Sequence, residues 1–119
     1  MRTIFSFLLT VIFLFGCAQP NPTESNANGN AAPEINSITI DPVFITVGTT
    51  TKITIDAIDP EGDPLSYSWT VALGDIIGSG AEVRYTAAFC CVGTNTLHLE
   101  VKDSKGAGVK KSIEIVVNP

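Results

Sequence analysis

The stretch TKITIDAIDPEGDPLSYSWTV, residues 51–71, decides the fold because its apolar side chains recur at every second position. In residues 51–58 this alternation places Ile53, Ile55 and Ala57 on one face. Residues 65–71 repeat it with Leu65, Tyr67, Trp69 and Val71. The Asp, Pro and Gly residues between the two runs favour a tight turn. The stretch therefore predicts two strands joined by an acidic turn.

The same alternation continues outward in both directions along the chain. Apolar runs interrupted by turn residues cover residues 35–40, 43–47, 82–86, 94–102 and 109–117, and Asp41-Pro42 separates the first two. No window has the 3.6-residue period of a helix. Short alternating strands with frequent turns indicate an all-β fold. We predict a single antiparallel β-sandwich of about seven strands over residues 35–119.

Two segments carry a resemblance to a known family. The stretch DAIDPEGDPLSYSW (residues 56–69) and the later VKDSKGAG (residues 101–108) resemble the Ig-like modules of the PKD and cadherin-like superfamilies. The chain departs from the usual PKD motif after Trp69, where it reads Thr-Val-Ala-Leu-Gly-Asp. The resemblance implies an Ig-like or PKD-like sandwich, and we expect Trp69 to pack between its sheets.

Four acidic residues form a candidate calcium site. Asp59, Glu61 and Asp63 crowd one turn, and the Ig topology brings the final hairpin with Asp103 to the same end. Ca²⁺ takes six to eight hard oxygen ligands, and related cadherin-like and collagenase PKD-like modules bind calcium in this region. Alternatively, the acids shape the turn and are solvated, with Lys102 and Lys105 neutralising them.

The N-terminus has the pattern of an export signal. Residues 4–15 are uncharged and almost entirely apolar, and as a helix they would span about 18 Å, short of the ~30 Å hydrocarbon core. The sequence Leu14-Phe15-Gly16-Cys17 resembles the lipobox of bacterial lipoproteins. That resemblance implies a signal peptide over residues 1–16, cleavage before Cys17 and lipidation of its thiol. Two or three acyl chains anchor a protein stably, whereas one binds marginally.

A polar segment follows the cysteine. Residues 18–34 read AQPNPTESNANGNAAPE and hold no large apolar residue, so we predict a disordered tether over residues 17–34. Because the first strand starts at the acidic end of an Ig sandwich, we expect the tether to emerge there. The acidic loops would then face the membrane and residues 47–51 would face outward. The lipoprotein resemblance further implies that Ala18, in place of an aspartate, favours the outer over the inner membrane, on its periplasmic or surface side.

Cys90 and Cys91 are the two cysteines that remain once Cys17 is lipidated. Adjacent Cα atoms lie 3.8 Å apart, closer than in most disulfides. Free thiols, a disulfide between the two neighbours and pairing with another chain all stay open. In an extended strand one of the two side chains would be buried and the other exposed.

Charge and motifs narrow the function classes. The formal net charge is −5 and becomes −6 without residues 1–16, which contain only Arg2 among the charges. An acidic chain without a basic stripe argues against nucleic acid as a partner. We identify no catalytic residues, and the single histidine, His98, is expected on an outward face. We therefore expect a non-enzymatic, lipid-anchored envelope protein that binds a protein or glycan or acts as a spacer. The alternative is a small accessory subunit of an envelope secretion or polysaccharide-handling complex.

Overall fold

The computed structural model describes residues 29–119, which form eight strands and one short 3₁₀ turn. The strands are β1 (Glu34–Asp41), β2 (Phe44–Thr46), β3 (Thr50–Ile58), β4 (Leu65–Val71), β5 (Asp75–Ile77), β6 (Glu82–Thr86), β7 (Gly93–Asp103) and β8 (Gly108–Asn118). The 3₁₀ turn, η1, spans Phe89–Cys91. None of the helical turns in residues 29–119 is long and apolar enough to cross a bilayer.

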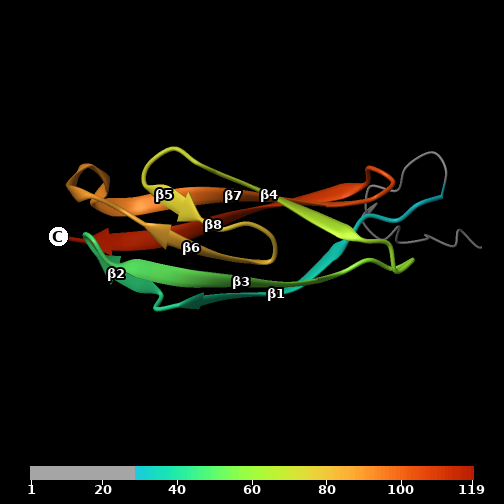
Figure 1. Ribbon diagram of the computed structural model, residues 1–119, viewed down its shortest axis with the longest axis horizontal. Coiled ribbons are helices and arrows are strands. Elements are labelled where there is room, and N and C mark those ends of the chain that lie inside the picture. Colours follow the sequence, from blue (N-terminus) through green and yellow to red (C-terminus); the bar gives the residue numbers. More distant parts are fainter. Residues whose placement is uncertain (1–28) are drawn as a thin grey trace, which may run out of the picture.

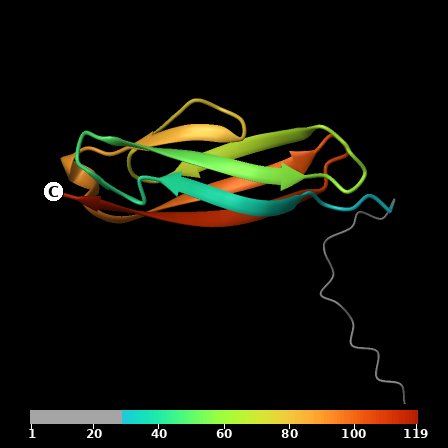
Figure 2. The ribbon, with the colours of Figure 1, turned by 90° about the horizontal axis from the view of Figure 1, so that it is seen from below.

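The strands build two four-stranded sheets that pack face to face. One sheet has the order β1-β3-β6-β5 and the other the order β2-β8-β7-β4. Figures 1 and 2 show the two layers and the chain entering them at the end opposite the C-terminus. This arrangement confirms the predicted all-β, Ig-like sandwich.

The core lies between the two sheets, on the faces that the alternation predicted. Ile53, Ile55 and Tyr85 come from the first sheet, and six aliphatic side chains come from the second: Leu97, Leu99, Val101, Ile113, Ile115 and Val117. All are buried, and burying one such side chain stabilises the fold by about 1.5–3 kcal/mol. Trp69 packs against this core, as expected, and its Nε1 donates a hydrogen bond to the Gly80 carbonyl at 3.0 Å.

The chain changes sheets at Asp41-Pro42, where the peptide bond is cis. Before this point β1 pairs antiparallel with β3, and after it β2 pairs with β8. The buried Thr51 hydroxyl donates to the Pro42 carbonyl at 2.6 Å and holds the crossing against β3. The β2–β8 pair is parallel, so the prediction of a wholly antiparallel sandwich was wrong for this pair. The reason is that β2 continues in the direction of β1 on a different sheet.

The folded part begins before residue 35. Asn30, Ala32 and Pro33 are buried, and β1 itself starts at Glu34. Assigning all of residues 17–34 to a disordered tether was therefore wrong for residues 30–34. These residues lack large apolar side chains, but polar contacts with distant loops hold them in place. The rest of the predicted tether, up to residue 28, lies outside the described residues.

Candidate functional site

Three acidic side chains meet at the end of the sandwich where the described chain begins. Carboxylate oxygens of Asp59, Asp63 and Asp103 all lie within 4.8 Å of one another. Asp59 and Asp63 belong to the β3–β4 turn, and Asp103 ends β7. The structure thus brings together the turn and the final hairpin as the sequence predicted. We call Asp59, Asp63 and Asp103 the acidic cluster.

Glu61, the fourth predicted ligand, is not among the three residues whose carboxylate oxygens meet in the acidic cluster. Its Oε1 accepts a hydrogen bond from the Ala31 backbone N–H at 3.1 Å. This contact ties the N-terminal segment to the β3–β4 turn. The Glu61 carboxylate therefore holds the backbone of Ala31 against the turn.

Asp59 shapes the β3–β4 turn with one carboxylate oxygen. Its Oδ1 accepts hydrogen bonds from the backbone N–H groups of Glu61, at 2.9 Å, and Asp63, at 3.0 Å. The Gly62 N–H bonds the Asp59 carbonyl at 3.0 Å. Asp59 Oδ2 is buried and has no hydrogen-bond partner among residues 29–119. The same carboxylate therefore builds the turn and offers one free oxygen.

Asp103 is the most deeply buried acid of the cluster, with 5% of its surface exposed. Burial opposes its ionisation. The Asn30 side chain and the N–H groups of Lys105 and Ala107 donate hydrogen bonds to its carboxylate, at 2.5, 2.8 and 3.0 Å respectively. These bonds outweigh the burial and hold the pKa of Asp103 below its ordinary value. The carboxylate is therefore kept charged inside the loop.

Lys105 supplies a counter-charge to the cluster. Its Nζ lies 2.8 Å from Asp63 Oδ2, and this contact raises the pKa of Lys105, although burial acts against it. The other lysine considered from the sequence, Lys102, instead pairs with Glu100, at 3.3 Å. Of the two lysines proposed to neutralise the acids, Lys105 therefore contacts the acidic cluster and Lys102 pairs with another residue.

Asn30 is the residue of this site that the sequence did not reveal. Its Nδ2 bonds Asp103, while its Oδ1 is buried without a hydrogen-bond partner among residues 29–119. The surrounding segment also contains Asn21, Asn26 and Asn28. The sequence therefore could not show which of these asparagines belongs to the site. What sets Asn30 apart is its hydrogen bond to Asp103, which is 73 residues away in the chain.

The cluster is chemically suited to a hard cation. Carboxylate and amide oxygens are ligands that Ca²⁺ takes, and the unpartnered Asp59 Oδ2 and Asn30 Oδ1 are two such atoms. The ammonium of Lys105 already occupies Asp63. A cation using Asp63 Oδ2 would therefore have to displace that lysine.

The two neighbouring cysteines in the C-terminal half of the chain lie at the other end of the sandwich. Cys90 and Cys91 form a disulfide between chain neighbours within η1. Cys91 is buried and Cys90 is exposed, but they lie in a 3₁₀ turn, so the strand alternation considered from the sequence is not the cause. The predicted lipidation site, Cys17, is outside the described residues.

The remaining residue considered for chemistry is on the surface. His98 is exposed on the outer face of β7, as predicted, and its Nδ1 lies 3.2 Å from Ser112 Oγ. Among residues 29–119 this hydroxyl is the hydrogen-bond partner found for its side chain. The contact resembles the ordinary pairing of polar side chains across a sheet.

A comparison with protein families gives one match. The family described as Bacterial Ig domain matches residues 30–116, which is most of the chain. The match starts at Asn30, the first residue that the structure places in the acidic site. No curated protein matches the chain closely enough to be counted as a relative.

Solved structures share the fold. The PKD domain of an M14-like peptidase from a Thermoplasmatales archaeon is 27% identical to this chain, with a TM-score of 0.58. The likeness covers 76% of this chain and 99% of that domain. A nucleoside hydrolase-related protein from Saccharophagus degradans, associated with carbohydrate metabolism, is 20% identical with a TM-score of 0.61. SGBP-B of a Bacteroides ovatus mixed-linkage glucan utilization locus is 22% identical with a TM-score of 0.53.

The share of each structure that is matched differs. The likeness covers 80% of this chain but 28% of the Saccharophagus protein, and 76% of this chain but 25% of the Bacteroides protein. The fold seen here is thus a whole domain in one relative and a part of longer chains in the others.

Proposed function

This chain belongs to the bacterial Ig domain family, and on that premise we propose that it is a non-enzymatic, lipid-anchored protein of the cell envelope. Its Ig-like module would bind a protein or glycan, or hold a partner at a distance from the membrane. The observation that carries the proposal is the match to the PKD domain of an M14-like peptidase, which spans 99% of that domain and 76% of this chain. Such a match supports the role of a module and not of a catalytic unit.

The carbohydrate-related names among the similar structures do not transfer a ligand to this chain. At 20% and 22% identity, these likenesses support the fold alone. The ligand class therefore has to be argued from the surface of this chain.

The membrane anchor is the second part of the proposal. It rests on the lipobox resemblance of residues 14–17. The described chain begins beside the acidic cluster, as the hydrogen bonds of Asn30 and Ala31 show, and opposite the C-terminus (Figure 2). With Cys17 lipidated, this end would face the membrane, and the end with residues 47–51 and η1 would face outward.

Two measurements test the anchor and the binding role separately. Labelled palmitate should be incorporated into the protein and lost in Cys17→Ser, while Cys90→Ser, as the matched control, should retain the label. For binding, the intact protein would be cross-linked and recovered from its own membranes. A specific protein or glycan recovered with it supports binding, and co-purification of a secretion or polysaccharide-handling complex supports the accessory-subunit role. Recovery of a catalysed product from added envelope substrates would contradict the proposal.

A calcium role for the acidic cluster is a second candidate, which the unpartnered oxygens of Asn30 and Asp59 favour. We propose that Ca²⁺ binds Asp59, Asp63, Asp103 and the Asn30 amide oxygen in competition with Lys105. Bound ion would stabilise the loops from which the tether emerges, because a ligand that binds only the folded state raises its stability.

Replacing Lys105 tests whether the acidic cluster binds calcium. Lys105→Ala frees Asp63 Oδ2 and should strengthen calcium binding by about tenfold or more. Lys52→Ala, which changes a lysine near Glu82 on the other sheet, should leave it unchanged. The measurement is calorimetric titration together with the melting temperature at millimolar calcium. Absence of heat and of a melting shift in all three proteins would eliminate the candidate.

A further inference from the structure

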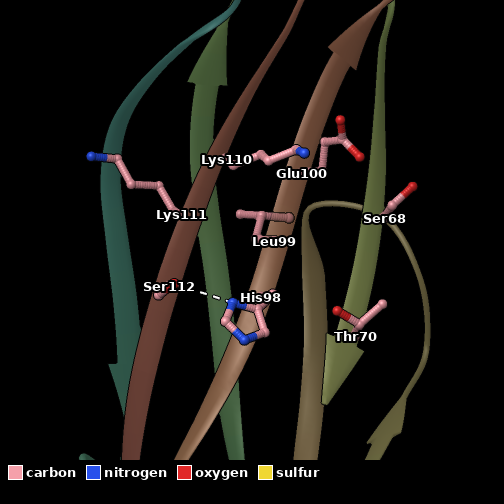
Figure 3. A pocket seen from close by; sticks show the side chains of 8 residues that line it. All are labelled: Ser68, Thr70, His98, Leu99, Glu100, Lys110, Lys111 and Ser112. Atoms are coloured by element: carbon pink, nitrogen blue, oxygen red, sulfur yellow. Dashed lines mark hydrogen bonds between the residues drawn. The ribbon is translucent and has the colours of Figure 1, made fainter. Parts of the chain in front are cut away.

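We propose that the outer face of the β4–β7–β8 sheet carries a binding groove for an acidic oligosaccharide. This inference rests on the proposed binding role and names its ligand class and its site. The groove consists of two adjoining hollows of about 440 and 560 Å³ that share Glu100 and Lys110. We call it the outer groove, and Figure 3 shows the first hollow. Volumes of this size are typical of ligand sites.

Strand register builds the outer groove in rows across three strands. Thr70 of β4 lies opposite His98 of β7, which lies opposite Ser112 of β8. The next row in the same direction joins Ser68, Glu100 and Lys110. Because side chains alternate between faces, residues two apart on each strand share the outer face. Six polar side chains from distant parts of the chain thus converge on one surface.

The chemistry of the rows fits a polyhydroxylated ligand. Ser68, Thr70 and Ser112 each present a hydroxyl that both donates and accepts hydrogen bonds. The contact between His98 and Ser112 uses Nδ1 of the ring and leaves Nε2 for a ligand. The residues that line the two hollows include no aromatic side chain besides this imidazole. Recognition there would depend on hydrogen bonds and charge, in contrast to stacking on a large aromatic ring.

The charge of the outer groove selects an acidic ligand. Glu100 is the one acidic residue that lines it, and it is ion-paired with Lys102 at 3.3 Å. Lys110 faces Glu100 across the sheet in Figure 3 but forms no ion pair with any of residues 29–119 at 4.0 Å or less. Lys111, which also lines the first hollow, forms no ion pair with residues 29–119 either, so two ammonium groups remain for ligand carboxylates. Charge-assisted hydrogen bonds of this kind are among the stronger polar contacts.

The length of the outer groove favours an oligomer over a single sugar. The next row, beyond that of Glu100, contains Lys102, which is paired with Gly108. Lys102 Cγ lies 2.8 Å from where a Gly108 side chain would start, so the lysine covers the glycine. From the row of His98 to the row of Lys102 is four residues, or about 13 Å along a strand. This distance exceeds one sugar ring.

The experiment titrates the detergent-solubilised full chain with tetragalacturonic acid and follows backbone amide chemical shifts. Cellotetraose is the neutral probe of matched length. We expect tetragalacturonic acid to shift the amides of the two rows, and cellotetraose to bind at least about tenfold more weakly. Lys110→Ala should weaken binding of the acidic probe by about tenfold or more. Lys52→Ala, an exposed lysine of the other sheet, should leave it unchanged.

Three results would overturn the inference: no shifts at millimolar tetragalacturonic acid, equal binding of cellotetraose, or shifts confined to residues outside the outer groove. These failures are distinguishable from failure of the proposed function. A specific partner recovered from membranes by a protein that ignores tetragalacturonic acid would leave the binding role intact and eliminate the acidic-saccharide groove.

Discussion

Replacing Gly74 by alanine tests how tightly the β4–β5 connection packs on the core. Gly74 has a φ of +88°, a conformation that L side chains rarely adopt. A Cβ there would lie 2.5 Å from the Tyr85 Oη and 2.7 Å from the Thr86 carbonyl oxygen. Tyr85 is fully buried, and its hydroxyl donates to the Leu73 carbonyl at 2.9 Å. Burial, with a contribution from Asp75, also raises the pKa of Tyr85. Neither obstacle can move without breaking a hydrogen bond or shifting a strand.

The expected magnitude has two parts. The left-handed backbone conformation costs an alanine about 1–2 kcal/mol. Steric overlap with a fixed neighbour in a packed region adds about 1–3 kcal/mol. The sum predicts that Gly74→Ala lowers the free energy of unfolding by about 2–5 kcal/mol.

Gly48 offers a matched control. It has a similar φ of +79°, but a Cβ there would meet nothing within 4 Å. Gly48→Ala should therefore lose only the backbone part, about 1–2 kcal/mol. Urea unfolding followed by the fluorescence of Trp69, the single tryptophan, measures both variants. Equal losses in the two variants would refute the claim that Tyr85 and the Thr86 carbonyl make Gly74 obligatory.

Three further predictions concern polar side-chain groups that form hydrogen bonds inside the fold. Asn95→Ala removes the 2.6 Å hydrogen bond from the buried Asn95 Nδ2 to the Cys91 carbonyl and should lower the free energy of unfolding by about 1–3 kcal/mol; urea unfolding unchanged from wild type would contradict this. Trp69→Phe loses the hydrogen bond from Nε1 to the Gly80 carbonyl and should lower the free energy of unfolding by about 1 kcal/mol. The melting temperature, followed by circular dichroism, measures this loss, and an unchanged value would contradict the prediction. Because the pKa of Asp103 is lowered in the folded state, its stabilising contribution is present above about pH 4, the unfolded pKa, and is lost as pH falls through the folded value. In Asp103→Asn the free energy of unfolding should therefore fall less steeply as the pH is lowered below about 4. A fall as steep as that of wild type would show that other carboxylates cause the acid destabilisation.

The fold was largely predictable because strand alternation is a local property. The alternation in the segments 51–58, 94–102 and 109–117 puts Ile53, Leu97 and Ile115 on the apolar faces of their strands, and all three are fully buried. The strand β5 (Asp75–Ile77) escaped prediction because its three residues show no alternation and no longer apolar run surrounds them, in contrast to β2, which lies within the run of residues 43–47. The parallel placement of β2 also escaped, since Asp41-Pro42 marks a break but not the sheet that receives the next strand.

The site was predictable only in part. The topology placed Asp103 beside Asp59 and Asp63, and the structure brings the three together. Glu61 belongs to the same turn, yet it reaches Ala31 instead of the cluster. Adjacency in a turn fixes which residues are near, but the direction of each side chain depends on the partner that reaches it.

By itself the sequence determined the all-β sandwich, the faces of its strands and the acidic turn, because these follow from spacing within a few residues. The tertiary structure alone decided that Asn30 holds Asp103 across 73 residues and that Lys105 balances Asp63. It also decided that Thr70, His98 and Ser112 form one row of a groove. Each of these contacts joins segments remote in the chain, and strand register and loop packing, which no local pattern encodes, set their positions.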